Sequence, residues 1–181
     1  ATRIVVAGPA HGFEGTIRPG HFTGVATVVC RLLLAVPADV AYFGAKDWQQ
    51  TLVVKRMVRD LGLPVTIVVC PTVREADGLA LSSRNVYLSA AERPRATALC
   101  ASLERAEDAW RAGAAVTAIE AAMREPLAAA GVAIDYATVV DAESLEPPRE
   151  GLPAVALVAG RLGTTRLIDN RELPPRASGA G

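Results

Sequence analysis

Two short polar stretches in the apolar first half of this sequence carry residue types that bind phosphate. "GAKDWQQ" begins at Gly44, and "GLALSSRN" begins at Gly78. In the first stretch, an ammonium at Lys46 can meet phosphate oxygens while the carboxylate of Asp47 holds Mg²⁺ or a ribose hydroxyl. The second stretch offers two hydroxyls, a guanidinium and backbone N–H groups to an anion such as a polyphosphate.

Each stretch also has an ordinary structural interpretation. Lys46 and Asp47 can be turn and cap residues, and residues 78–85 can be a polar loop that caps the next helix. Of the 19 lysines and arginines only Lys46 and Lys55 are lysines, and Lys55 falls within a helical pattern as a surface residue would. The local sequence alone leaves both interpretations open.

Smaller polar features near these stretches are equally ambiguous. The segment before the second stretch carries Arg74, Glu75 and Asp77, which are typical of a solvated loop. His21 starts a helical pattern, where it can hydrogen-bond a bound carboxylate or simply cap the helix or pack at its end. These residues therefore do not decide the question.

The elements that would position these residues alternate along residues 1–88. "RIVVAG", "VAYFG" and "VTIVVC" are apolar runs of strand length, and helical patterns cover residues 21–36 and 47–61. This alternation predicts a parallel sheet with crossover helices. Ligands bind such sheets outside the carboxyl ends of the strands, which is where Lys46 and Asp47 would lie.

The pattern changes after residue 88. A capping-box pair at Ser89 and Glu92 opens a helical pattern that ends at Gly113, and a second alanine-rich helix follows with a kink expected at Pro126. Three strand candidates, "IDYATVVD", "AVALVAG" and "TRLID", complete the sequence of elements. Helices followed by a strand meander predict a small α+β domain over residues 89–181.

The composition excludes several classes of partner. The 181 residues carry no formal net charge and are 51% hydrophobic, and the basic residues are scattered, so neither nucleic acid nor an anionic membrane is expected as a partner. The longest apolar run is broken by Arg31 and is too short to span a bilayer. Cys30, Cys70 and Cys100 lie far apart in apolar stretches, which favours reduced, buried thiols and a cytoplasmic protein.

Four motifs together resemble one family. "GFEGTIRPGHFTGV", "YFGAKDWQQ", "PTVREADGLALSSRN" and "LVAGRLGTTRLIDN" occur in the order and spacing of the pantothenate synthetases, the ATP-dependent pantoate:β-alanine ligases. The resemblance runs from about Ile4 to Asn170. It implies an α/β protein with part of a Rossmann-like nucleotidyltransferase domain over residues 1–88, a small α+β lid domain over residues 89–181, and a homodimer.

The resemblance also implies an activity. Members activate pantoate with ATP and Mg²⁺ to pantoyl adenylate, releasing pyrophosphate, and β-alanine then displaces AMP to give pantothenate for coenzyme A biosynthesis. In this sequence, Lys46, Ser82, Ser83 and Arg84 would neutralise the charge that develops on the α-phosphate and the leaving pyrophosphate. Gln50 would bind pantoate, with Arg18 and His21 in the wall of the site. The ATP-binding positions, with Asp47 also the Mg²⁺ ligand, would be Gly44, Ala45, Lys46, Asp47, Val73, Leu81, Ser82, Ser83 and Arg84.

Three departures from the family pattern limit what the resemblance implies. Ala45 stands where the family has glutamate, and Leu81 where it has methionine, a near-isosteric exchange. The family's HxGH motif, whose histidines contact the ATP phosphates, is absent from the sequence. We therefore expect this chain to be the C-terminal portion of such an enzyme, inactive alone. The alternatives are a related acyl-adenylate-forming ligase for another acid or amine, and a non-catalytic binding or dimerisation fragment.

Overall fold

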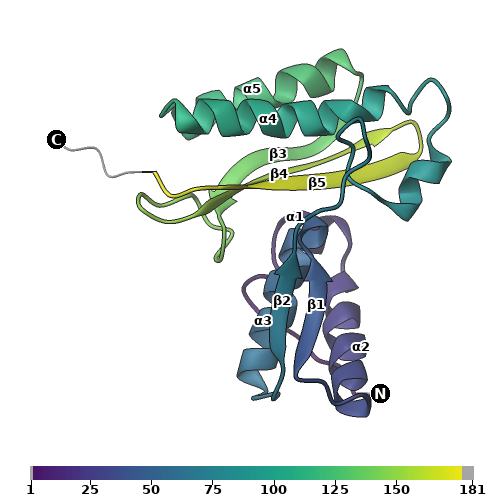
Figure 1. Ribbon diagram of the computed structural model, residues 1–181, viewed down its shortest axis with the longest axis vertical. Coiled ribbons are helices and arrows are strands. Elements are labelled where there is room, and N and C mark those ends of the chain that lie inside the picture. The colour runs from purple at the N-terminus through teal and green to yellow at the C-terminus, as the bar shows by residue number, and fades with distance from the viewer. Residues whose placement is uncertain (1, 177–181) are drawn as a thin grey trace. The chain divides into compact units, whose positions relative to one another are not determined.

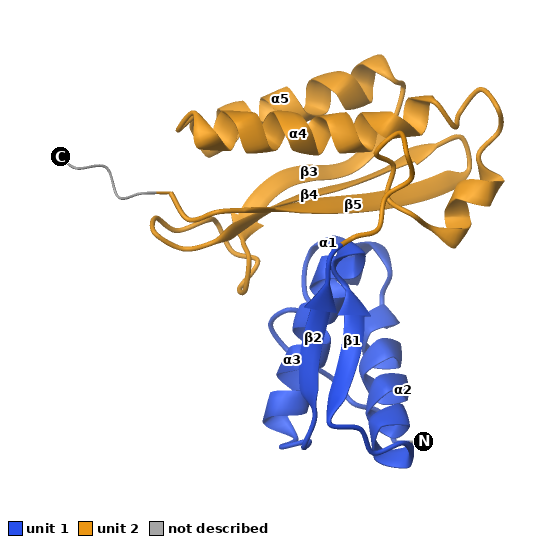
Figure 2. Ribbon diagram, in the orientation of Figure 1, with its two compact units in different colours: residues 1–71 blue, residues 72–181 orange. Residues whose placement is uncertain are grey.

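The computed structural model describes residues 2–176. The chain divides into two compact units, Ala1–Pro71 and Thr72–Gly181 (Figures 1 and 2). Each unit has its own hydrophobic core: one cluster extends from Val6 to Val58, and the other from Leu79 to Leu173. We describe the units one at a time.

Unit 1 contains the predicted parallel sheet. Strands β1 and β2 pair in parallel, with Val40 opposite Thr66. The elements are α1 (Phe13–Ile17), α2 (His21–Ala35), β1 (Val40–Gly44), the 3₁₀ turn η1 (Ala45–Asp47), α3 (Trp48–Asp60) and β2 (Thr66–Cys70). Both expected helices are confirmed, and Figure 1 shows α2 and α3 beside the two strands.

The expected first strand is not formed. Residues 2–7 have no regular secondary structure, and the backbone N–H of Ile4 donates to the hydroxyl of Thr27 at 2.9 Å instead of to a neighbouring strand. Only β1 and β2 make up the sheet of this unit among the described residues, so the apolar run "RIVVAG" finds no strand partner there. Val6 nevertheless packs into the core while Val5 is exposed, which is the alternation of an extended segment.

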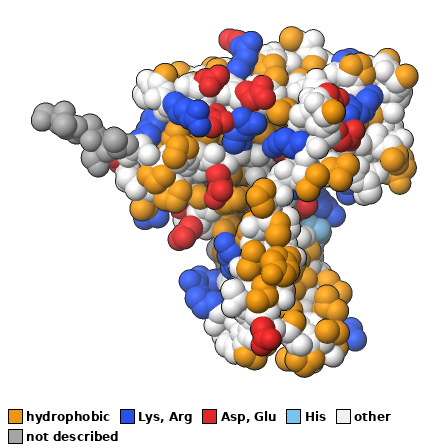
Figure 3. Space-filling view, in the orientation of Figure 1, with side chains coloured by type: hydrophobic (Ala, Val, Ile, Leu, Met, Phe, Trp, Pro, Cys, Tyr) orange, Lys and Arg blue, Asp and Glu red, His pale blue; other side chains and the backbone are white. Residues whose placement is uncertain are grey.

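Apolar side chains remain exposed on unit 1. Helix α2 buries Phe22, Ala26 and Cys30, which recur every fourth residue, and leaves Val28 62% exposed on another face. On β1, Tyr42 is 69% exposed, and Figure 3 shows hydrophobic side chains gathered over the strands of this unit. None of the helices within residues 2–176 combines the length and hydropathy needed to cross a bilayer.

Unit 2 is an α+β unit, as predicted. Its strands β3 (Ala133–Asp141), β4 (Ala154–Leu162) and β5 (Thr165–Leu173) form an antiparallel sheet in the order β3-β4-β5. Helices α4 (Ala98–Arg111) and α5 (Val116–Ala129) pack as a pair along one face of that sheet (Figure 1). Short 3₁₀ turns, η2 (Ser83–Tyr87) and η3 (Arg95–Thr97), precede α4.

Helix α4 begins later than the capping box predicts. The capping box itself is present, since the backbone N–H of Ser89 donates to Glu92 Oε2 at 2.9 Å and that of Glu92 to Ser89 Oγ at 3.3 Å. A turn follows, and the α-helix starts only at Ala98. Pro94 explains the delay, because it lacks the N–H for an i→i−4 bond and restricts the backbone of the residue before it.

The segment 72–88 packs within unit 2. Leu79 belongs to the core of this unit, and Arg74 makes a bidentate ion pair with Asp169 on β5, at 2.7 and 3.1 Å. The division after Pro71 therefore lies earlier in the chain than the domain boundary expected at residues 88 and 89. That this segment completes the Rossmann-like domain stays a prediction.

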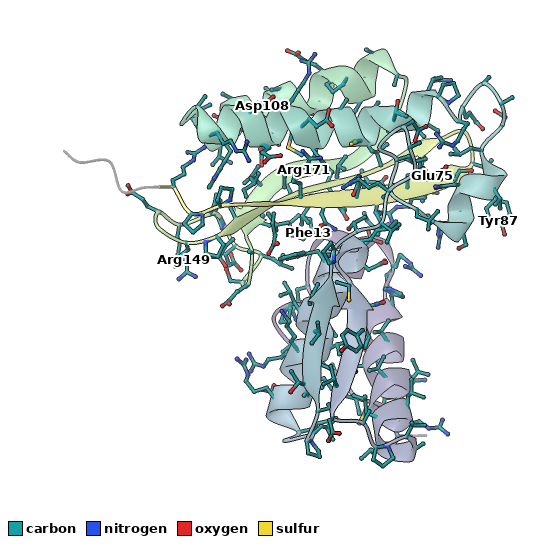
Figure 4. The ribbon with its side chains drawn as sticks, in the orientation of Figure 1. Phe13, Glu75, Tyr87, Asp108, Arg149 and Arg171 are labelled. Carbon is teal, nitrogen blue, oxygen red and sulfur yellow. The ribbon has the colours of Figure 1, made fainter. Side chains whose placement is uncertain are left out.

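The turn after β3 gives unit 2 a pH-dependent stability. Burial alone would raise the pKa of Asp141, but hydrogen bonds from the backbone N–H groups of Ser144 and Glu143 and from Arg149 lower it to about 2 (Arg149 is labelled in Figure 4). A carboxyl whose pKa is lower folded than unfolded stabilises the fold above its unfolded pKa and loses this contribution as the pH falls.

We therefore expect Asp141 to contribute about 2 kcal/mol of stability at neutral pH, lost between about pH 4 and pH 2. Urea unfolding of the wild type and of Asp141→Asn at several pH values measures this. The variant should show a flatter pH dependence over that range, and parallel curves would contradict the assignment.

Candidate functional site

Lys46 and Asp47 directly follow the carboxyl end of β1, as the sequence predicts. They lie in η1, which leads into α3, and Asp47 is exposed. Gly44 has an extended backbone that any residue can adopt, and a Cβ placed on it would meet no atom within 4 Å. The end of β1 is therefore open, and a ligand can approach the backbone there.

The paired glutamines after this turn have different surroundings. Gln49 is buried, and its amide donates to the carbonyl oxygens of Pro9 and His11, both at 2.9 Å. Its Oε1 accepts the backbone N–H of Glu14 at 3.0 Å. Gln49 therefore anchors the loop before α1, while the half-buried Gln50 is the glutamine left for a ligand. The family resemblance had selected Gln50 for the ligand, whereas the anchoring role of Gln49 was not predicted.

Arg18 and His21 contact each other at the start of α2. Arg18 Nη1 lies 3.2 Å from His21 Nε2. A guanidinium can only donate, so Nε2 of His21 is the acceptor when this contact is a hydrogen bond. Both side chains line a surface depression together with Val25 and Val28. The structure thus brings these two predicted residues together.

In unit 2, the predicted residues lie on a narrow two-stranded loop. The backbone N–H of Leu81 donates to the carbonyl of Val73 at 2.8 Å, and Arg74 and Ala80 form an isolated antiparallel bridge. Gly78 closes the loop with a φ of +89°, a conformation that L side chains rarely adopt, and a Cβ there would lie 3.1 Å from Cys100 Sγ. A glycine is therefore strongly favoured at this turn.

Ser82, Ser83 and Arg84 follow in η2 and its N-cap. Ser82 Oγ accepts the backbone N–H of Arg84 at 3.2 Å, and the side chains of Ser83 and Arg84 are exposed. No ion pair within residues 2–176 joins Arg84 to a carboxylate. Hydroxyl groups and an uncompensated guanidinium are thus presented on one short turn, which suits a polyphosphate.

The predicted residues fall into two groups, one in each unit. Unit 1 holds Arg18, His21, Gly44, Ala45, Lys46, Asp47 and Gln50, and unit 2 holds Val73, Leu81, Ser82, Ser83 and Arg84. Within the groups, Arg18 contacts His21 in unit 1, and Leu81 is hydrogen-bonded to Val73 in unit 2.

The loop residues that looked merely solvated are paired. Glu75 and Asp77 both bind Arg93, at 2.7 and 2.6 Å, and Glu75 also accepts the side-chain amide of Asn85 at 2.6 Å. Sequence reasoning missed Asn85 and Arg93, although Asn85 lies within the motif "SSRN". No local pattern indicates a contact between residues 75 and 93.

The described residues could hold Mg²⁺ through a single carboxylate, that of Asp47, but not through a cluster of protein ligands. Among residues 2–176, no group of three or more His, Cys, Asp or Glu side chains is arranged to hold a metal ion. Asp47 offers a single exposed carboxylate. Proteins commonly hold Mg²⁺ with one or two carboxylates plus substrate phosphates, so Asp47 fits an ion that a nucleotide brings with it.

The chain is similar to known proteins over most of its length. A family model described as pantoate-beta-alanine ligase matches residues 1–172. Pantothenate synthetase from Acidiphilium cryptum is 53% identical over 172 residues, which cover 93% of this chain and 61% of that protein. Pantothenate synthetase from Thermus thermophilus is 51% identical over 178 residues, covering 97% of this chain and 64% of that protein.

Solved structures agree with these matches. The crystal structure of the Thermus thermophilus enzyme superposes with a TM-score of 0.91 at 51% identity, over 97% of this chain and 64% of that chain. A Francisella tularensis pantoate-beta-alanine ligase complexed with beta-gamma ATP and beta-alanine gives a TM-score of 0.72 at 30% identity, over 94% and 58%. The chain thus spans less than two thirds of the length of these relatives, and it has the mixed α/β fold of its structural neighbours.

Proposed function

Because this chain belongs to the pantoate-beta-alanine ligase family, we propose that it forms part of an enzyme that joins pantoate to β-alanine using ATP. The observation that carries the proposal is the match of residues 1–172 to the family, with phosphate-binding residue types after β1 and on η2. The Francisella tularensis relative, crystallised with beta-gamma ATP and beta-alanine, supports both ligands.

In the proposed first step, a pantoate carboxylate oxygen attacks the α-phosphorus of ATP. The bond from the α-phosphorus to the bridging oxygen breaks, and pyrophosphate leaves with the electron pair. As the family resemblance implies, Lys46, Ser82, Ser83 and Arg84 supply the cations and hydrogen-bond donors that stabilise this charge. Gln50 orients the pantoate oxygens for in-line attack.

In the proposed second step, the β-alanine amine attacks the acyl carbon of pantoyl adenylate. The acyl carbon–oxygen bond breaks, AMP leaves, and the amine loses a proton to solvent, giving pantothenate. The Arg18–His21 pair forms part of the wall around the acid. Magnesium, held by Asp47 and the nucleotide phosphates, would supply further neutralisation of the phosphate charge. The backbones of Gly44, Ala45 and Val73 and the side chain of Leu81 line the nucleotide.

We further propose that catalysis needs the family's HxGH motif, which this chain does not contain, so that the 181 residues alone are inactive. The active enzyme is proposed to be a cytoplasmic homodimer. The apolar side chains exposed on α2 and β1 support association with another polypeptide surface.

Exchange of pyrophosphate into ATP tests the function. It is measured with pantoate and Mg²⁺ for the 181-residue chain and for a fusion to the part of the Thermus thermophilus relative that this chain does not match. We expect exchange by the fusion and none by the chain alone. Pyrophosphate exchange by the 181-residue chain alone would refute the proposal that this chain is inactive by itself. A fusion that exchanges only with another hydroxy acid would show a related adenylating ligase, and a fusion that exchanges with no acid would contradict the proposed reaction.

A further inference from the structure

The turn that carries Ser82, Ser83 and Arg84 lies next to β5 but leaves most of its side chains exposed. Ser83, Arg84, Val86 and Tyr87 are all exposed, and Figure 4 shows Tyr87 at the outer side of this segment. The hydrogen bond from Arg84 N to Ser82 Oγ stays within the turn. An exposed turn with few apolar contacts samples several conformations unless other residues fix it.

Besides lying next to β5, this turn is hydrogen-bonded to the rest of unit 2 through one side chain. Asn85 Nδ2 donates to Glu75 Oε1 at 2.6 Å and to the carbonyl of Ala80 at 3.1 Å. Both partners are acceptors, so the orientation of the amide is determined. In the part of the chain that the structure describes, no other side chain of residues 82–87 makes a hydrogen bond outside these residues.

Glu75 is in turn held by Arg93. One oxygen of its carboxylate accepts from Asn85, and the other accepts from Arg93 Nη2 at 2.7 Å. Nη1 of Arg93 donates to Asp77 Oδ2 at 2.6 Å. Hydrogen bonds from Arg93 lower the pKa of both Glu75 and Asp77, so both carboxylates are ionised acceptors at neutral pH.

Arg93 and Asp77, at the end of these contacts away from the turn, are held by backbone hydrogen bonds. Arg93 follows the capping box, and its backbone N–H donates to the carbonyl of Ser89 at 2.9 Å. Asp77 Oδ1 accepts the backbone N–H of Leu79, whose side chain is buried in the core. The contacts therefore run from a packed region of unit 2 to an exposed turn.

We propose that Arg93, Glu75 and Asn85 form a relay that holds residues 82–84 in the geometry that binds the ATP phosphates. All three are positioning residues, since they act through the turn and not on the nucleotide. The inference rests on the proposed function for its ligand, but the relay itself rests only on the contacts within unit 2.

Hydrogen exchange of the turn tests the relay without any activity. In the 181-residue chain, Arg93→Ala and Glu75→Ala should raise amide exchange of residues 81–87 about tenfold while peptides from α4 and β4 stay protected. Glu75→Gln keeps an oxygen for Asn85 but loses the charge that binds Arg93, so it should have a smaller effect. Arg105→Ala, which removes an exposed pair with Glu125, is the matched control and should change nothing in the turn.

Steady-state kinetics of ATP–pyrophosphate exchange by the fusion test whether the relay supports ATP binding. The two alanine variants should raise the KM for ATP about tenfold with little change in the KM for pantoate, because misplaced phosphate contacts weaken ATP selectively. Arg93→Lys, which can still reach one carboxylate, should recover part of the loss.

The two experiments can fail independently, so they distinguish an error in the relay from an error in the proposed function. Unchanged exchange of residues 81–87 would overturn the relay, and so would increased exchange across all of unit 2, which would indicate general destabilisation. Faster exchange of the turn with an unaltered KM for ATP would overturn its role in ATP binding. If the wild-type fusion catalyses no exchange of pyrophosphate, the proposed function fails, while the hydrogen-exchange result still decides whether the relay exists.

Discussion

Replacing Lys46 with alanine is expected to slow ATP–pyrophosphate exchange by the fusion about 10²- to 10³-fold, the usual loss when one preorganised transition-state contact is removed. Lys46 follows the open carboxyl end of β1 in unit 1, where an ammonium can meet phosphate oxygens. The rate of exchange at saturating ATP and pantoate measures the effect. Far-UV circular dichroism should be unchanged, because η1 buries no residue.

Lys55 is a suitable control for Lys46, because it has the same side chain at an exposed helix position. It is the one other lysine of the sequence, and it lies exposed on α3, away from the turn that carries Lys46. Lys55→Ala should leave exchange within about twofold of the wild type, since an exposed helix position contributes little beyond propensity. Equal rates for Lys46→Ala and Lys55→Ala would contradict the assignment of Lys46 to the phosphates.

The sequence predicted the elements that depend on local patterns. The parallel pair β1 and β2, helices α2 and α3, and the antiparallel sheet of unit 2 follow from periodicity and from the glycines and prolines that end the elements. The run at residues 3–8 was wrong as a strand, because a strand needs a partner and periodicity does not provide one. Helix α4 starts later than predicted for a local reason, Pro94, which the prediction from the capping box did not take into account.

In the candidate site, too, the sequence predicted local features but not the contacts made through the tertiary fold. The positions of Lys46 and Asp47 after a strand and of residues 82–84 on a turn could be predicted, since the motifs are continuous in sequence. The supporting contacts could not, because Glu75 meets Arg93 and Gln49 meets the loop at His11 only through the tertiary fold. The resemblance selected Gln50 for the ligand, but the residue types alone do not show that Gln49 is buried and anchors a loop.

The ion pair between Arg74 and Asp169 should have the largest effect on stability. The side chain of Asp169 is 1% exposed. It accepts hydrogen bonds from Nη1 and Nη2 of Arg74 at 2.7 and 3.1 Å, and another from the backbone N–H of Asn170. Asp169→Ala leaves a partly buried guanidinium without its counter-charge, so we expect unit 2 to lose about 3–5 kcal/mol. Urea unfolding followed by Trp110 fluorescence, in a Trp48→Phe background so that only unit 2 reports, measures this loss.

Two further variants show whether the unpaired charge causes the loss. Glu125→Ala removes an exposed carboxylate that pairs with Arg105 at 2.5 Å, and it should cost less than about 1 kcal/mol. The double variant Arg74→Met, Asp169→Leu removes both charges and should recover much of the stability, because an apolar pair of similar volume carries no buried charge. If the double variant is as unstable as Asp169→Ala, the cost lies in lost packing, in the hydrogen bond that Arg74 donates to the carbonyl of Gly78, or in the one that Asp169 accepts from the backbone N–H of Asn170. The segment 72–88, with the turn that it carries, would then be held on β5 by those contacts and not by the charge pair.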